Sequence, residues 1–207
     1  MELARESGIE ADVVVPVPDG GTPAALGFAQ ASGIPFEYGI IRNHYVGRTF
    51  IEPTQQIRAL GVKLKHSANR AMIEGKRVVL VDDSIVRGTT SVKIVQMIRD
   101  AGAKEVHIRV ASPMIYHPDF YGIDTPHADK LLANQHKDLE SMCRYIGADS
   151  LAFLSIDGLY KAVGGNPRDP KAPAFTDHYF TGEYPTRLLD QEGESNVHTL
   201  SLLASNG

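Results

Sequence analysis

The sequence is poor in cysteine and contains no tryptophan: its 207 residues include a single cysteine, Cys143. One cysteine excludes an internal disulfide and argues strongly against a cysteine-held metal cluster within one chain. No apolar run approaches the roughly 18 to 20 residues of a membrane span, so no membrane partner is expected. The first residues, Met1 to Glu6, have no apolar signal core, which favours a cytoplasmic location.

Acidic residues outnumber basic ones over the whole chain, but basic residues are concentrated in one segment. The formal net charge is −4, which argues against a general nucleic-acid binder. Residues 42–70 nevertheless contain six basic side chains and one acid, Glu52, a balance of +5. Such a segment in an acidic chain is typical either of a site for a small polyanion or of a solvated basic loop.

Short apolar segments rich in β-branched residues alternate with helical patterns along the first half of the chain. Strands are expected at residues 13–17, 36–41, 77–81 and 106–111, and helices at 22–32 and 89–101. This alternation predicts an α/β fold with a doubly wound, mostly parallel sheet.

The later part of the chain changes character. Residues 121–164 have a mostly helical pattern with one short strand near 151–154. Beyond residue 164 the segment contains several prolines and little periodicity, which is typical of extended or partly ordered chain. We therefore expect one domain at residues 1–164, with a helical C-terminal part, and an extension at 165–207.

The clearest chemical signal follows the third expected strand. Asp82 and Asp83 fall at its carboxyl end, where open parallel sheets bind ligands. Gly88 allows the backbone to approach a ligand, and Thr89 to Ser91 open a helix whose free N–H groups suit a phosphate. Carboxylates for hydroxyls or a metal beside amides for a phosphate indicate a sugar phosphate.

The whole run from Asp82 to Thr90 resembles the phosphoribosyl pyrophosphate (PRPP) signature of type I phosphoribosyltransferases. Most relatives have Thr-Gly before the final Thr, whereas this chain has Arg87-Gly88, a form that resembles the amidophosphoribosyltransferase (glutamine PRPP amidotransferase) family. Residues 15–19 resemble that family's pyrophosphate loop and residues 42–51 its flexible catalytic loop. Further similar runs lie at 68–70, 121–124 and 146–149, so the resemblance covers about residues 2 to 190.

The resemblance implies a reaction of purine biosynthesis in which ammonia displaces pyrophosphate from PRPP to give 5-phosphoribosylamine, with Mg²⁺ as cofactor. It implies metal binding by Asp82 and Asp83, and a loop closing over substrate that carries the expected catalytic residues Arg42, Tyr45 and Arg48. It also implies a homo-oligomer. The expected substrate-binding residues are Asp19, Gly20, Gly21, Lys65, Asp82, Asp83, Ser84, Ile85, Val86, Arg87, Gly88, Thr89 and Thr90.

Three departures from the family pattern qualify these expectations. The chain begins within the transferase part, so a glutaminase domain supplying ammonia is expected in cis in a longer protein or in trans. The turn at Gly20-Gly21 lacks the hydroxyl that many relatives carry there. Residues 175–182 lack the cysteines of the branch that binds an iron–sulfur cluster, so no iron–sulfur cluster is expected.

Three other functions remain open on sequence alone. The chain could be a non-catalytic PRPP-binding regulatory protein, an inactive fragment, or another PRPP enzyme such as a base-salvage transferase. An intact closing loop at residues 42–51 favours an enzyme over a pure binder.

Overall fold

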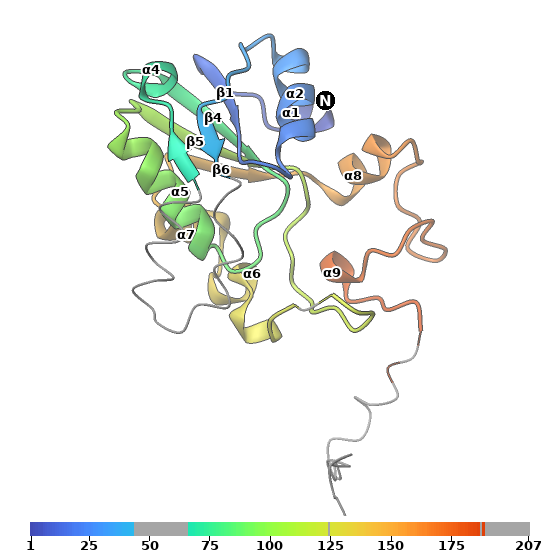
Figure 1. Ribbon diagram of the computed structural model, residues 1–207. Helices are drawn as coiled ribbons and strands as arrows, with labels where there is room; N and C mark the ends of the chain where they lie inside the picture. Colours follow the sequence, from blue (N-terminus) through green and yellow to red (C-terminus); the bar gives the residue numbers. More distant parts are fainter. Residues whose placement is uncertain (44–65, 124, 187, 189–207) are drawn as a thin grey trace, which may run out of the picture.

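The computed structural model describes residues 1–43, 66–123, 125–186 and 188. Its core is a four-stranded parallel sheet in the order β1-β4-β5-β6 (Figure 1). The strands are β1 Val13–Pro16, β4 Arg77–Asp82, β5 Glu105–Val110 and β6 Ser150–Phe153. The predicted α/β fold with a doubly wound, mostly parallel sheet is therefore confirmed.

Helices cover both faces of the sheet, as all-parallel strands require. On one face α1 (Glu2–Glu6) and α2 (Thr22–Ser32) pack on Val14, Val79 and Val81. On the other face α5 (Thr89–Asp100) and α7 (Leu139–Ile146) pack on Val78, Leu80 and their neighbours. Alternate residues of β4 thus face opposite layers, which explains its continuous apolar run.

The remaining helices are short. They are α4 Arg70–Ile73, the 3₁₀ helix η2 Ala128–Lys130, α6 Leu132–Gln135, α8 Ile156–Ala162 and α9 His178–Thr181. Figure 1 shows α6 and α9 on the side of the sheet away from α4. Among the described residues, no helix is long and apolar enough to cross a membrane.

The strand expected at residues 36–41 is wrong as a single element. Phe36 forms one parallel bridge with Val14, whereas β2 (Ile40–Arg42) pairs antiparallel with β3 (His66–Ala68) in a separate two-stranded sheet. The chain bends between them, because Gly39 N–H donates to Glu37 O at 2.9 Å. Gly39 also lies so close to Val15 that an added Cβ would be 2.8 Å from Val15 Cγ2.

The described residues beyond 164 are held to the domain by buried polar side chains. Asp177, 3% exposed, accepts hydrogen bonds from Tyr160 Oη at 2.8 Å and Arg168 Nε at 2.6 Å. The next residue, His178, pairs through Nε2 with Asp119 Oδ1 at 2.9 Å. These contacts join the segment to α8 and to the loop after β5; the domain boundary at residue 164 stays a prediction.

An ion pair fixes the register where β1 and β4 begin. Arg77 N–H donates to Asp12 Oδ2 at 2.7 Å, and the Arg77 guanidinium donates to both Asp12 oxygens. In return, Asp12 N–H donates to Arg77 O at 2.9 Å. These hydrogen bonds lower the pKa of Asp12 from 3.8 to about 2.

The Asp12→Asn variant should have a lower melting temperature than the wild type at pH 6. Because the folded-state pKa of Asp12 lies below its unfolded value, this stabilisation is complete above pH 3.8 and disappears as pH falls through about 2. Thermal unfolding across pH 2 to 7 measures it. Glu10→Gln is the control, because the Glu10 side chain is 96% exposed and its ion pair with Arg77 is long, at 3.7 Å. A difference in melting temperature between the wild type and Asp12→Asn that does not change with pH would contradict the ion-pair explanation.

Candidate functional site

Two loops meet at the carboxyl edge of the sheet because β1 and β4 are neighbours. Pro16 pairs with Val81, and Val17 N–H continues the ladder by donating to Val81 O at 2.8 Å. Residues 17–21 therefore lie beside residues 82–88, although about 60 residues separate them in the chain. This edge is where open α/β sheets bind their ligands.

An open groove of about 770 Å³ lies between these loops. Its walls combine a turn, a strand end, a loop and the first turn of a helix. The lining residues are Val17, Pro18, Asp19, Gly20, His66, Asp82, Asp83, Ser84, Ile85, Val86, Arg87, Gly88, Thr89, Thr90, Ser91, Ile94 and Pro126. The groove is large enough for a small phosphorylated molecule.

The structure brings together most of the residues expected from the sequence. Asp19, Gly20 and the whole run Asp82 to Thr90 line the groove, whereas Gly21 does not line it and lies against the carbonyl groups of Val17 and Val81. Tyr45, Arg48 and Lys65 lie outside the described residues, so their roles stay predictions.

The loop after β4 is held in place by the hydrophobic core and by α6. Ile85 is 4% exposed and belongs to the core under α5. Val86 O accepts a hydrogen bond from Leu132 N–H of α6 at 2.8 Å. Gly88 adopts a left-handed conformation with φ of 74°, and an added Cβ would be 3.0 Å from a Leu132 methyl. The loop therefore needs glycine at this position.

The loop leads directly into the N-terminus of α5, which opens on the groove. Val92 N–H donates to Gly88 O at 3.0 Å, closing the first turn. The preceding N–H groups of a helix have no partner within the helix, and its dipole is positive at this end. With the exposed hydroxyls of Thr89 and Thr90, this part of the groove suits a phosphate group.

Two carboxylates line the same groove where β4 ends. Asp83 N–H donates to Asp82 Oδ1 at 2.9 Å, and Ser84 Oγ donates to Asp83 Oδ1 at 3.1 Å. Burial, and then the negative charge of Asp83, raise the pKa of Asp82 from 3.8 to about 7. A cation or hydroxyl donors placed between the two carboxylates would favour their ionised forms.

The turn at Gly20-Gly21 fits tightly against this part of the groove. A Cβ on Gly20 would collide with the Asp83 carboxylate. A Cβ on Gly21 would clash with the backbone, lying 2.8 Å from Val17 O and closer still to Val81 O. The two glycines therefore permit close contact between the two loops.

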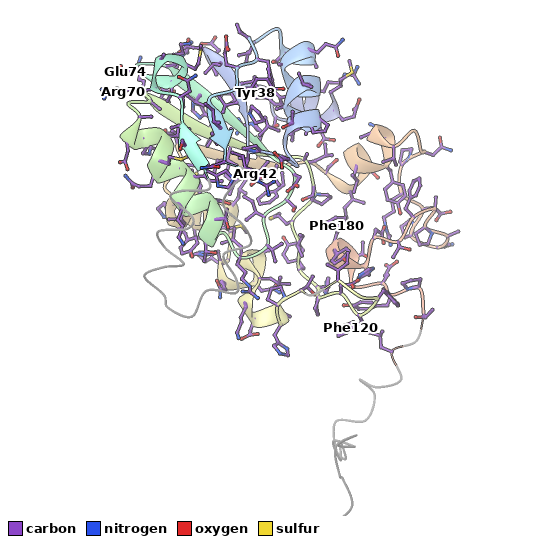
Figure 2. The ribbon with its side chains drawn as sticks, in the orientation of Figure 1. Tyr38, Arg42, Arg70, Glu74, Phe120 and Phe180 are labelled. Atoms are coloured by element: carbon purple, nitrogen blue, oxygen red, sulfur yellow. The ribbon has the colours of Figure 1, made fainter. Side chains whose placement is uncertain are left out.

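Arg42 reaches the same edge from β2. Its guanidinium forms an ion pair with the Asp19 carboxylate across 23 residues of sequence, and Figure 2 shows it beside the sheet. The pair joins the expected catalytic loop to the expected pyrophosphate turn.

The donor set of the site suits Mg²⁺ bound together with substrate. Among the described residues, no group of three or more His, Cys, Asp or Glu side chains could hold a metal alone. Mg²⁺ typically takes one or two carboxylates and completes its shell with substrate oxygens and water. Asp82 and Asp83 match that pattern, whereas they would be a poor site for a tightly held structural metal.

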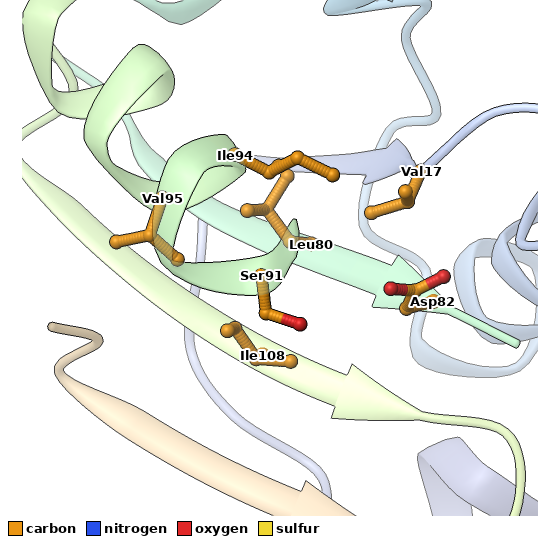
Figure 3. A pocket seen from close by; sticks show the side chains of 7 residues that line it. All are labelled: Val17, Leu80, Asp82, Ser91, Ile94, Val95 and Ile108. Carbon is orange, nitrogen blue, oxygen red and sulfur yellow. The ribbon is translucent and has the colours of Figure 1, made fainter. Parts of the chain in front are cut away.

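Besides Val17 and Pro18 of the expected pyrophosphate loop, four residues line the groove that were not expected as site residues: His66, Ser91, Ile94 and Pro126. His66 and Pro126 come from distant segments, and no local motif connects either to the Asp82 to Thr90 run. Ser91 was expected only to add a hydroxyl to the phosphate site. It is buried, and its hydroxyl points toward Asp82 (Figure 3).

Comparisons with known proteins agree with this geometry. The family described as "Phosphoribosyl transferase domain" matches residues 2–117. The chain is 83% identical over its whole length to an amidophosphoribosyltransferase of Rhizobium etli, covering 42% of that protein. It is 54% identical over 186 residues to the amidophosphoribosyltransferase of Bacillus subtilis, covering 39% of it. The chain thus spans about two fifths of the length of these curated relatives.

A solved structure shares the fold. The glutamine PRPP amidotransferase of Bacillus subtilis, complexed with ADP and GMP, superimposes with a TM-score of 0.81 at 53% identity. The match covers 92% of this chain and 41% of that chain. The similarity therefore extends well beyond residue 117.

Replacing Gly20 with alanine should weaken ligand binding more than folding. The added Cβ must displace the Asp83 side chain, which can rotate, whereas Gly21→Ala collides with backbone and should destabilise the fold by about 1–3 kcal/mol. Urea unfolding and PRPP titration of each variant separate the two effects. Gly8→Ala is the control, because a Cβ there meets only Ala4 O at 3.4 Å. Unchanged PRPP affinity in Gly20→Ala would contradict this role of the turn.

Proposed function

This chain belongs to the phosphoribosyl transferase domain family, and we propose that it transfers the phosphoribosyl group of PRPP to ammonia, yielding 5-phosphoribosylamine and pyrophosphate. The observation that carries the proposal is that one groove is lined both by the carboxylates of Asp82 and Asp83 and by the N-terminus of α5. A ribose 5-phosphate has the matching groups, hydroxyls on the ring and a dianion at C5.

The residues supply positions and charges for this substrate. In the proposal, the amides and hydroxyls at Gly88, Thr89 and Thr90 bind the 5′-phosphate. Asp82 and Asp83 accept hydrogen bonds from the ribose hydroxyls and are the Mg²⁺ ligands. When bound, Mg²⁺ supplies positive charge that stabilises the departing diphosphate.

The turn of Asp19, Gly20 and Gly21 faces the diphosphate in this arrangement. Its glycines let the backbone approach the leaving group, and Arg42, paired with Asp19, adds positive charge near it. The C1–O bond to pyrophosphate breaks and a C1–N bond forms with the ammonia lone pair; the excess proton passes to solvent. Such a step depends mainly on positioning and electrostatic stabilisation.

The proposal also includes the source of ammonia, the oligomeric state and the location of the protein. The amidophosphoribosyltransferases that it resembles are more than twice its length, and the source of ammonia in the proposal is a glutaminase domain, in cis or in trans. A homo-oligomeric state and a cytoplasmic location complete the proposal. Tyr45 and Arg48 are proposed to act with Arg42 over the substrate, and Lys65 at the diphosphate.

The double variant Asp82→Asn/Asp83→Asn should reduce Mg²⁺-dependent pyrophosphate release from PRPP and ammonia by about 100-fold or more. The substitution removes both negative charges while preserving side-chain size. A coupled pyrophosphate assay at saturating ammonia measures the rate. Asp100→Asn is the matched control, since Asp100 is exposed at the far end of α5 and should leave the rate unchanged.

Two results would count against the proposal. A near-normal rate in the double variant would exclude Asp82 and Asp83 from the reaction. PRPP binding by the wild type without pyrophosphate release at any ammonia concentration would instead indicate a binding protein.

A further inference from the structure

A small cavity adjoins the groove and shares Val17, Asp82, Ser91 and Ile94 with it. It holds about 10 Å³, close to the space that one water molecule needs. Its lining residues are Val17, Leu80, Asp82, Ser91, Ile94, Val95 and Ile108 (Figure 3). Two of these seven side chains are polar, Asp82 and Ser91.

Ser91 is a buried polar residue in an apolar layer. It is 6% exposed and lies in the first turn of α5. The other buried side chains of α5 are apolar: Ile94, Val95 and Ile98. Figure 3 shows its hydroxyl pointing toward the Asp82 carboxylate across the cavity. A buried hydroxyl stabilises a fold only when it is hydrogen-bonded, so its natural partner here is this carboxylate.

Asp82 needs such a partner. Its Oδ1 accepts one hydrogen bond, from Asp83 N–H, and the surrounding side chains of Val17, Leu80 and Ile108 are apolar. If the Asp82 carboxylate faces a ligand in the groove, its remaining acceptor positions need a hydrogen-bond donor on the side of the cavity.

We propose that Ser91 is a positioning residue for Asp82: its hydroxyl, through one water molecule in the cavity, holds the carboxylate facing the groove. The inference rests on the proposed function, in which Asp82 binds the ribose hydroxyls and Mg²⁺. Such a bridge is nearly as favourable as a direct hydrogen bond where the site is polar and holds one water.

The bridge also connects the start of α5, where the phosphate is proposed to bind, with the Asp82 carboxylate. Ser91 belongs to the helical turn whose amides face the phosphate site, and Gly88 closes that turn by accepting from Val92 N–H. Its side chain meanwhile lies against the strand that carries Asp82. One turn of α5 thus sets the spacing between the phosphate site and the carboxylate, which a ribose 5-phosphate must span.

The variants Ser91→Thr and Ser91→Val test the role of the hydroxyl. Their side chains have nearly the same shape, but threonine keeps the hydroxyl and valine does not. A purely packing role would affect both equally. Melting temperatures without ligand show whether both variants fold, and Val95→Ala is a control that enlarges the same cavity and keeps Ser91.

Calorimetric titration with PRPP and Mg²⁺ gives the decisive comparison. Ser91→Thr and Val95→Ala should bind PRPP within about threefold of the wild type, and Ser91→Val about tenfold more weakly or worse. Inorganic phosphate, which reports the α5 amides alone, should bind all four proteins equally.

Equal PRPP affinity in the threonine and valine variants would overturn the inference while leaving the proposed function intact. A parallel loss of phosphate affinity in Ser91→Val would overturn it too, because Ser91 would then act only on the helix start. Failure of the wild type to bind PRPP would overturn the proposed function, and with it this inference.

Discussion

The parallel pairing of β1 with β4 is the constraint on which the rest of the site depends. It places the turn after β1 and the loop after β4 at one edge of the sheet. The two loops can approach only because Gly20 and Gly21 have no side chain to meet Asp83 and the Val81 carbonyl. The groove is thus a consequence of strand order together with two small residues.

Opposite electrostatic demands are met within a few residues of this edge. Asp82 and Asp83 place two carboxyl groups where β4 ends, and burial, followed by the charge of Asp83, raises the pKa of Asp82 to about 7. A few residues later the start of α5 presents backbone amides and a positive dipole end. In the proposed function, a ligand with hydroxyls or a metal beside a phosphate satisfies both demands.

Much of this could be read from the sequence, because the information is local. The run from Asp82 to Thr90 lies in one segment, and the expected helix at residues 22–32 matches α2, which Gly33 terminates in a left-handed conformation. The helix expected at 89–101 ends one residue earlier, at Asp100.

What the sequence could not show depends on contacts between distant segments. Residues 36–41 have the composition of a strand, but the chain bends at the Gly39 N–H to Glu37 O hydrogen bond, and Ile40 pairs in a second sheet. His66 and Pro126 reach the groove through tertiary packing. Ser91 looked like another phosphate donor because periodicity alone does not show that its hydroxyl points under the strand end.

The proposed function fixes the orientation of the substrate in the groove. A crystal structure of the chain with PRPP and Mg²⁺, without ammonia, tests this most directly. The expected complex has the 5′-phosphate on the amides of Thr89 and Thr90, with the ribose hydroxyls facing Asp82 and Asp83. A ligand bound in the reverse orientation, or outside this groove, would contradict it.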